Sequence, residues 1–154
     1  MDWGLRRATR DDVAALAELN RQLIADEGSR NPMTLPQLAA RMADFLATGW
    51  EAVAVTVGGE VIGYCLFQSR KDEYFPARAV VYVRQYVLRR DCRGAGLGRA
   101  AFERIAAEFF PPDTAEVALE VLVANRRGEH FWRSLGFTAQ SVALRREVPP
   151  VVDV

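Results

Sequence analysis

The chain has 154 residues, of which 50% are hydrophobic and 26% charged. These proportions are typical of a folded globular domain and exclude disorder as a global state. No apolar run approaches the roughly 18 residues needed to span a bilayer, and the acidic Asp2 near the start argues against a signal peptide. We therefore expect a single domain over residues 1–154, cytoplasmic and without membrane contact.

The charges and the rare residues exclude several functions. The 20 basic and 20 acidic residues cancel, whereas a nucleic-acid binder is expected to be basic. One His and two widely separated Cys cannot supply the spacing of a zinc site, so we expect no metal. Lys71, the only lysine, follows Arg70 rather than glycine, which excludes a Gly-Lys-Ser/Thr phosphate loop.

Capping residues and apolar spacing predict the elements of the N-terminal part. A short strand is expected over residues 5–8, followed by a helix that Thr9 and Asp12 open as a capping box. Thr34 and Gln37 form a second capping box and open a second helix. Helical spacing of the apolar residues after each box supports both predictions.

Strands dominate the rest of the chain. Strands are predicted at 51–57, 61–69, 79–88 and 116–123, helices at 99–110 and 125–135, and one or two closing strands within 137–148. The segment 116–123 is almost continuously apolar, which predicts a strand buried on both faces.

A glycine-rich turn, Arg93-Gly94-Ala95-Gly96-Leu97-Gly98, connects the strand at 79–88 to the helix that follows. Glycines let a backbone approach a ligand closely, and a helix N-terminus offers free N–H groups and the positive end of the helix dipole. Successive N–H groups in such a turn can hold phosphate oxygens, and Arg93 adds a charge beside them. A purely structural turn on a solvated basic face is the alternative interpretation.

The turn does not fit the dinucleotide-binding pattern Gly-x-Gly-x-x-Gly. Starting from Gly94, the third glycine is replaced by Arg99, and starting from Gly96, the pattern begins too far beyond the strand. The turn fits Arg-x-x-Gly-x-Gly instead, from Arg93 to Gly98.

A second motif lies downstream, where Asn125 precedes Phe131-Trp132-Arg133-Ser134-Leu135-Gly136-Phe137. Together, the two motifs and the order of strand, turn and helix resemble the GNAT superfamily of N-acetyltransferases, most strongly from Ala79 to Phe137. The resemblance implies an α/β (α+β) domain with a mixed, mostly antiparallel twisted sheet of six to seven strands and about four helices. A V-shaped splay would separate the strands at 79–88 and 116–123.

The resemblance also implies that the protein binds acetyl-CoA as cosubstrate, without a metal. The turn would hold the pyrophosphate, and backbone groups of Val87 and Leu88 would pair with the pantetheine arm. One of their N–H groups would polarise the carbonyl of the acetyl thioester. The last helix would contribute a hydrogen bond to the arm. The residues that the resemblance assigns to the cofactor are Val87, Leu88, Arg93, Gly94, Ala95, Gly96, Leu97, Gly98, Arg99, Asn125 and Trp132.

The catalytic residues are less clear, because Trp132 stands where the family often has the tyrosine that protonates the leaving thiolate. Tryptophan has no acidic proton to give. Glu120 is a candidate base if burial raises its pKa, and Tyr86 is a candidate acid. Even spacing predicts that Tyr86 shares one strand face with Tyr82 and Arg84. The structural alternatives are core packing for the tyrosines and an edge position or an arginine partner for Glu120.

Arg84 is a further candidate, either for an acidic group on the acceptor or for a structural ion pair. Asp26 and Glu27 are candidates for attracting a cationic amine, or belong to a solvated turn. The acceptor itself is expected to be a small-molecule or peptide amine, with no nucleic acid as partner. Dimers are common in the family, so a homodimer is a further expectation by analogy.

Two functions therefore remain open, besides an unrelated phosphate-binding α/β domain of other use. The first is direct transfer of acetyl from CoA to a primary amine of a small molecule or protein. The second is a non-catalytic acyl-CoA-binding or regulatory module of the same fold. This alternative stays open because Trp132 replaces the tyrosine that often serves as the acid in the family.

Overall fold

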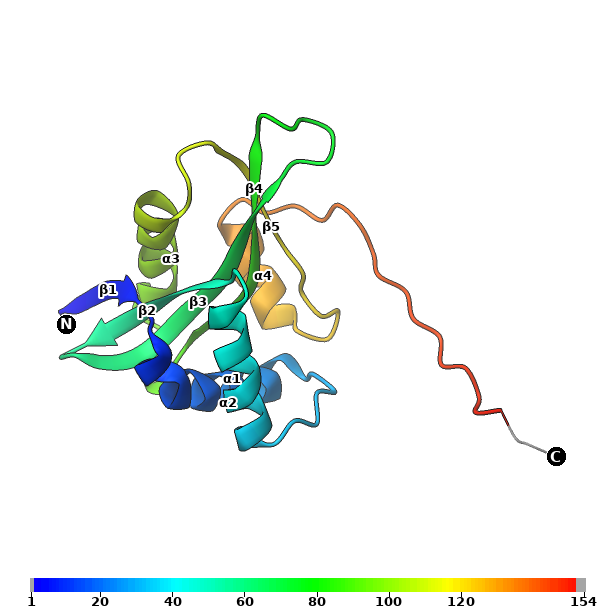
Figure 1. Ribbon diagram of the computed structural model, residues 1–154, viewed down its shortest axis with the longest axis horizontal. Coiled ribbons are helices and arrows are strands. Elements are labelled where there is room, and N and C mark those ends of the chain that lie inside the picture. Colours follow the sequence, from blue (N-terminus) through cyan, green and yellow to red (C-terminus); the bar gives the residue numbers. More distant parts are fainter. Residues whose placement is uncertain (1, 152–154) are drawn as a thin grey trace.

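The computed structural model describes residues 2–151 as one sheet covered by helices on both faces (Figure 1). The five strands of the sheet follow the order β1-β2-β3-β4-β5, antiparallel throughout except for the parallel pair β4 and β5. Their bounds are Trp3–Arg7 for β1, Glu51–Val57 for β2, Glu60–Lys71 for β3, Ala79–Leu88 for β4 and Thr114–Leu119 for β5. The predicted strands at 51–57 and 79–88 are confirmed residue for residue.

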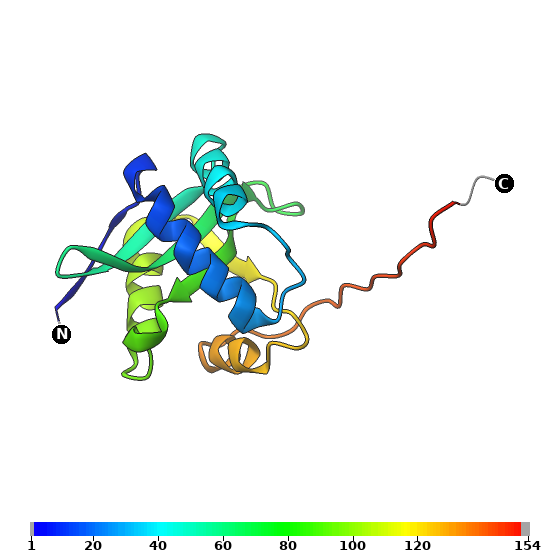
Figure 2. The same ribbon diagram turned by 90° about the horizontal axis from the view of Figure 1, so that it is seen from below.

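The structure has four α-helices within residues 2–151, at Val13–Glu27 (α1), Leu35–Ala47 (α2), Leu97–Phe109 (α3) and Arg126–Ser134 (α4). Helices α1 and α2 lie side by side on one face of the sheet (Figure 2), where Leu16 and Met42 pack against Tyr64 and Val87. Helix α3 covers the other face through residues such as Ile105, and α4 packs beside it. Within the described residues, none of these helices combines the length and apolar composition needed to cross a membrane.

Both predicted capping boxes are present. The Thr34 N–H donates to the Gln37 side-chain oxygen at 2.9 Å, and the Gln37 N–H donates to the Thr34 hydroxyl oxygen at 3.4 Å. The Asp12 carboxylate accepts a 2.8 Å hydrogen bond from the Thr9 N–H. The box at Thr34 opens α2, whereas the box at Thr9 opens a short 3₁₀ turn, Arg10–Asp12, that leads directly into α1. Each box satisfies N–H groups that a first helical turn leaves free, so local sequence was sufficient to place both helical segments.

Strand β4 contains a bulge that the sequence did not predict. Leu66 of β3 faces Gln85, and the next residue, Phe67, faces Val83, so Arg84 is an extra residue in β4. An extra residue shifts the alternation of faces by one position along the rest of the strand. The bulge therefore decides which side chains of β4 point to which helices.

The predicted common face of Tyr82 and Tyr86 is wrong for this reason. Tyr82 packs against Trp50 on the side of α2, with 6.2 Å between ring centroids. Tyr86 packs on the opposite side, 5.7 Å from the ring of Trp132 in α4. The bulge at Arg84 separates the two tyrosines by one extra residue and sends them to different layers.

The sheet has five strands rather than the predicted six to seven. Strand β5 ends at Leu119 and lies at the sheet edge, so the expectation of a strand at 116–123 buried on both faces is also wrong. Residues 138–151 carry the alternating apolar residues of a strand but leave the body of the molecule as an extended tail (Figures 1 and 2). Alternation marks one face of a strand, but a strand forms only where an edge pairs with it.

Candidate active site

The pairing of β4 and β5 ends at Val83 and Leu119, whereas β4 continues to Leu88. Residues 84–88 therefore have no neighbouring strand on that side among residues 2–151. On the other side, the Arg89 N–H donates to the Ile62 carbonyl of β3 at 2.7 Å. Because hydrogen-bonded pairs alternate in an antiparallel ladder, the backbone groups of Val87 face β3 and those of Leu88 face the free edge.

The glycine turn before α3 is open to solvent. Gly94 and Gly96 have φ angles of 98° and 77°, and no atom lies within 4 Å of the position that a Cβ would take at either residue. The N–H groups of residues 94–99 have no hydrogen-bond partner within the described part of the chain. Those of residues 97–99 open α3, where they add to the positive end of the helix dipole. The turn can thus receive an anion through its backbone.

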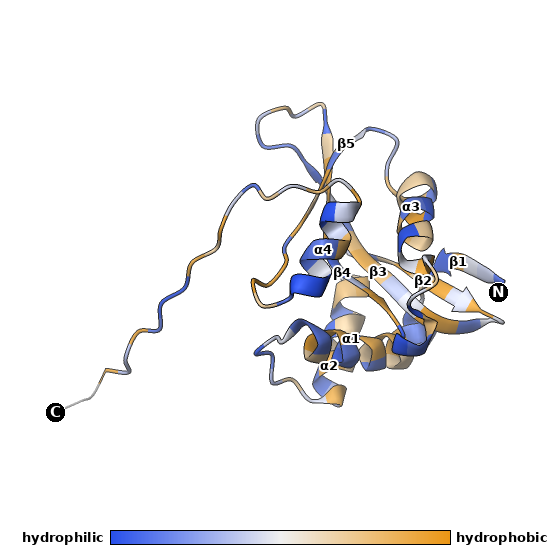
Figure 3. Cartoon of the chain, turned by 180° about the vertical axis from the view of Figure 1, so that it is seen from behind, coloured by the Kyte–Doolittle hydropathy of each residue, from blue (hydrophilic) through white to orange (hydrophobic). Residues whose placement is uncertain are grey.

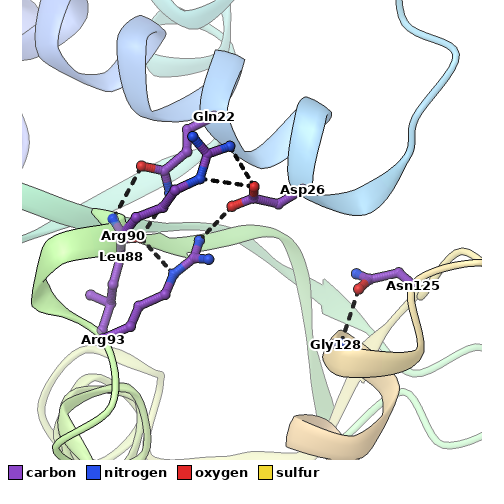
Figure 4. Close-up of polar contacts among 7 residues, drawn as sticks. All are labelled: Gln22, Asp26, Leu88, Arg90, Arg93, Asn125 and Gly128. Atoms are coloured by element: carbon purple, nitrogen blue, oxygen red, sulfur yellow. Dashed lines mark hydrogen bonds and ion pairs between the residues drawn. The ribbon is translucent and has the colours of Figure 1, made fainter.

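The charge of Arg93 is already paired within the protein, so the predicted free charge beside this turn is not present. Its Nε donates to the Leu88 carbonyl at 3.1 Å and its Nη2 donates to the Asp26 carboxylate at 2.8 Å (Figure 4). Arg90 binds the other oxygen of Asp26 at 2.6 Å. Asp26 therefore ties the end of α1 to both arginines and holds the turn against α1.

Burial alone would raise the pKa of Asp26, but its hydrogen bonds to Arg90 and Arg93 hold that pKa below its ordinary value. Asp26 is thus neither a solvated turn residue nor a free group for an amine. Gln22 of α1 adds a second link, since its amide donates to the Leu88 carbonyl at 2.9 Å and accepts from the Arg90 N–H at 3.2 Å. Nothing in the local sequence marks Gln22 or Asp26 for this role, because their partners lie more than 60 residues away.

With its carbonyl bound by Gln22 and Arg93, Leu88 presents its N–H to the free edge of β4. This is the kind of group that the resemblance assigned to the thioester carbonyl. The predicted backbone contact through Val87 is wrong, because the backbone of Val87 faces β3 and its side chain is buried in the core under α1 and α2.

Tyr86 holds the C-terminal end of the glycine turn through a hydrogen bond. Its hydroxyl donates a 2.6 Å hydrogen bond to the carbonyl of Gly98, and burial raises the pKa of that hydroxyl. A buried hydroxyl already bound to a carbonyl is placed to hold the backbone of the turn. The geometry thus gives Tyr86 a positioning role. The contacts of Tyr86 do not support the prediction that it protonates the leaving thiolate.

Trp132 belongs to an aromatic cluster between α3 and α4. Its ring centroid lies 5.0 Å from that of Phe102 and 5.3 Å from that of Phe137, in edge-to-face arrangements. Phe131 and Tyr86 complete the cluster. These contacts give the tryptophan a packing reason for standing where the family often has tyrosine.

Asn125 caps α4, because its side-chain oxygen accepts a 3.0 Å hydrogen bond from the Gly128 N–H (Figure 4). Its amide NH₂ has no acceptor among residues 2–151 and is available to a ligand.

Arg99 at the start of α3 reaches the last turn of α4, donating to the Ser134 carbonyl at 2.8 Å.

Glu120 follows directly after β5 and is exposed, so the prediction of a buried carboxylate at this position is wrong. The strand is an edge strand, which explains the exposure. Glu120 lies next to Tyr82, and burial together with the negative charge of Glu120 raises the pKa of the Tyr82 hydroxyl. The carboxylate therefore lies beside the point where β4 and β5 separate.

The sequence profile of the Acetyltransferase (GNAT) family matches residues 17–137, which include α2, the sheet from β2 to β5, the glycine turn and α4. The chain belongs to the GNAT acetyltransferase family. Members of this family transfer acetyl groups and generally use acetyl-CoA. A comparison with curated proteins gave no match.

Solved structures share the GNAT fold at low sequence identity. A possible acetyltransferase from Clostridium difficile 630 is 15% identical with a TM-score of 0.78, over 96% of this chain and 98% of that one. A ribosomal-protein-alanine N-acetyltransferase from Brucella melitensis biovar Abortus 2308 is 15% identical with a TM-score of 0.77, over 96% and 100%. A putative acetyltransferase from Agrobacterium tumefaciens str. C58 is 22% identical with a TM-score of 0.74, over 94% and 99%.

Proposed function

We propose that this protein is an acetyl-CoA-dependent N-acetyltransferase that transfers acetyl directly to a primary amine. One observation carries the proposal: the free N–H groups of residues 94–99 lie directly beyond the unpaired edge of β4. A diphosphate at the turn and an extended arm along residues 84–88 suit one ligand of the shape of acetyl-CoA. Family membership supports the same conclusion.

In this proposal, the backbone of the turn binds the pyrophosphate and the Asn125 amide donates to the pantetheine arm. The Leu88 N–H donates to the acetyl carbonyl oxygen, where negative charge develops during the reaction. Bound acetyl-CoA supplies an activated acyl group with a thiolate leaving group. Arg93 and Asp26 act on the ligand only through the turn, because their charged groups bind each other.

The acceptor amine must be neutral to attack. Its nitrogen forms a bond to the acetyl carbon while the carbon–sulfur bond breaks, and the electron pair of that bond leaves on sulfur. The nitrogen loses one proton, which we assign to Glu120 directly or through water. Since Trp132 cannot supply a proton to the sulfur, the thiolate leaves unprotonated or takes its proton from water.

Calorimetry with acetyl-CoA and Gly96→Glu tests the ligand site. The substitution places a Cβ and a carboxylate where the turn would meet phosphate, so we expect binding to be lost in a folded protein. Gly58→Glu is the matched control, because Gly58 also has a positive φ and open space around it but lies in the β2–β3 turn. Unchanged acetyl-CoA affinity in Gly96→Glu would refute the assignment.

Release of free CoA thiol in the presence of a panel of amines tests the activity. We expect release that depends on the amine and increases with pH as more of the amine is neutral. The alternative, a non-catalytic acyl-CoA-binding module, is favoured by one feature, the absence of the usual tyrosine at Trp132. Tight binding of acetyl-CoA with no amine-dependent release at any pH would establish that alternative.

A further inference from the structure

Three arginines gather on the face of the sheet that α2 covers, and one of them, Arg84, lies where the pairing of β4 with β5 ends. They are separated by three aromatic rings, and we call the whole group the arginine–aromatic face. Its members are Arg41, Phe45, Trp50, Arg70, Tyr82 and Arg84.

The contacts within this face are continuous. The guanidinium carbon of Arg84 lies 4.9 Å from the centre of the Phe45 ring and 5.6 Å from that of Trp50. Arg41 shares the Phe45 ring at 5.5 Å, and Arg70 shares the Trp50 ring at 5.7 Å. The Phe45 ring thus contacts Arg41 and Arg84, and the Trp50 ring contacts Arg70 and Arg84. These shared rings hold the three guanidinium groups close together.

No carboxylate among residues 2–151 forms an ion pair with any of the three arginines. Arg41 donates to the side-chain oxygen of Asn20 at 3.0 Å, but its buried Nε has no acceptor in the described chain. Burial and the positive charge of Arg84 lower the pKa of Arg41. The structural ion pair considered for Arg84 is thus absent, and the charges repel each other.

Stacking on a ring uses the face of a guanidinium and leaves its in-plane N–H groups for hydrogen bonds. Such N–H groups fit carboxylate and phosphate oxygens in a two-point contact. Arg84 is exposed and is the bulge residue of β4, directly after the last residue that pairs with β5. Its guanidinium therefore lies at the point where the acceptor must reach the proposed thioester.

We propose that the arginine–aromatic face binds an anionic group of the acceptor, so that the substrate is an amine that also carries a carboxylate or a phosphate. The inference rests on the proposed acetyltransferase function and names its substrate class. Arg84 binds the anion, Arg41 adds positive charge from α2, and the rings of Phe45 and Trp50 hold both guanidinium groups. Glu120, beside Tyr82, lies near the amine end of the same substrate.

The test compares amines in pairs that differ in the anionic group, using the full-length protein and release of CoA thiol. The pairs are β-alanine with propylamine, glycylglycine with glycinamide, and phosphoethanolamine with ethanolamine, which separates carboxylate from phosphate and free amino acid from peptide. We expect the anionic member of at least one pair to have a kcat/KM more than about tenfold higher than its neutral partner. Equal rates within every pair would overturn the proposal.

Arg84→Gln should abolish this preference by raising KM for the anionic amine about tenfold relative to KM for its neutral partner. Arg84→Lys should restore part of it, because the charge returns without the planar fork. Arg104→Gln, on α3 at the opposite face of the sheet, is the control. A preference that survives Arg84→Gln would overturn the role of Arg84. Failure of acetyl-CoA to bind at all would instead refute the proposed function.

The C-terminal tail supports a second inference from different observations. Within residues 138–151, Val142, Leu144 and Val148 expose 76%, 89% and 84% of their surface, and hydrophobic and hydrophilic stretches follow one another along the tail (Figure 3). The outer edge of β5 has no partner strand among the described residues. Each molecule thus carries an unpaired edge at β5 and an apolar segment of strand-like pattern.

Apolar tails and open sheet edges of this kind are usually covered in native proteins. Residues 138–148 extend up to about 36 Å if fully stretched and run away from their own sheet (Figure 1). We propose that the tail pairs with the β5 edge of a second copy of this chain. A twofold exchange would pair both tails with both β5 edges in one symmetric interface.

Light scattering after size exclusion tests this inference with the full-length chain. We expect the mass of two chains for the native protein and of one chain for Leu144→Pro, because proline removes an N–H that a paired strand needs. Val151→Pro, beyond Pro149 and Pro150, is the control and should remain dimeric. A monomeric native protein, or a Leu144→Pro variant that is still dimeric, would overturn the proposal.

Discussion

Asp26 and Arg93 are 67 residues apart in the sequence and form a 2.8 Å ion pair that fastens the glycine turn to α1. The turn that we assign to the pyrophosphate is therefore shaped by a helix on the opposite face of the sheet from α3. Arg90 shares the same carboxylate, so a single side chain holds both ends of the short segment that leads from β4 into the turn.

Removing this carboxylate should loosen the turn. For Asp26→Asn we expect a loss of about 1 kcal/mol in the free energy of unfolding and an increase of about fivefold in the Kd for acetyl-CoA. Urea unfolding and calorimetry at pH 7 measure the two effects. Glu18→Gln, elsewhere on α1 and paired only with Arg21, serves as the control. An unchanged Kd in Asp26→Asn would show that the turn keeps its shape without the ion pair.

The same residue predicts a pH dependence. Since the pKa of Asp26 is lower in the folded protein than its ordinary value, the ion pair stabilises the fold fully above that ordinary value. The contribution is lost as the pH falls through the lowered pKa, where the carboxylate takes up a proton. The stability difference between native protein and Asp26→Asn should therefore be largest at neutral pH and shrink under acid conditions. A difference that grows as the pH falls would contradict this assignment.

Tyr86→Phe separates a positioning role from a catalytic one. The substitution keeps the ring in the aromatic cluster and removes the hydrogen bond to Gly98, so we expect about 1 kcal/mol less stability and a weaker acetyl-CoA affinity. We expect kcat at saturating acetyl-CoA to change by less than about threefold, because the hydrogen bond positions the turn and takes no part in the chemical step. A fall of 100-fold or more in kcat with unchanged Kd, about the contribution of a general acid, would make Tyr86 the proton donor after all.

Trp132→Tyr tests the packing interpretation of the aromatic cluster. A tyrosine fills less space between Phe102 and Phe137, so we expect the protein to lose about 1–2 kcal/mol of stability. Acetyl-CoA binding should persist and the turnover should not fall, because no step assigned here uses the indole. Thermal unfolding and steady-state rates measure both, with Trp132→Phe as the comparison that adds no hydroxyl. Lower turnover in both variants would show that the indole contacts a substrate.

Glu120→Gln tests the proposed base. We expect kcat to fall by about 10²-fold while the Kd for acetyl-CoA stays the same, since Glu120 lies away from the turn. Glu116→Gln is the matched control, because Glu116 is another exposed carboxylate of β5 and pairs with Arg78. If both variants keep the native rate at every pH, water alone accepts the proton.

The sequence by itself determined the elements whose signals are local. The capping boxes at Thr34 and Thr9 placed two helices, because a cap needs only residues three positions apart. The strand, glycine turn and helix from Ala79 onward were also readable, since the turn requires a backbone that only glycine adopts easily and the helix must begin directly after it. Together with the motif from Asn125 to Phe137, this unit was enough to predict the family. The same unit contains the turn that we propose as the anion site.

Tertiary structure decided what depends on partners distant in sequence. The bulge at Arg84 exists only in the pairing of β3 with β4, and it alone decides that Tyr82 and Tyr86 lie on opposite faces. The exposure of Glu120 follows from the edge position of β5, which apolar composition cannot distinguish from a central position. Asp26 holds the glycine turn because folding brings the end of α1 next to the end of β4. A contact between residues 67 positions apart cannot be predicted from a local sequence pattern.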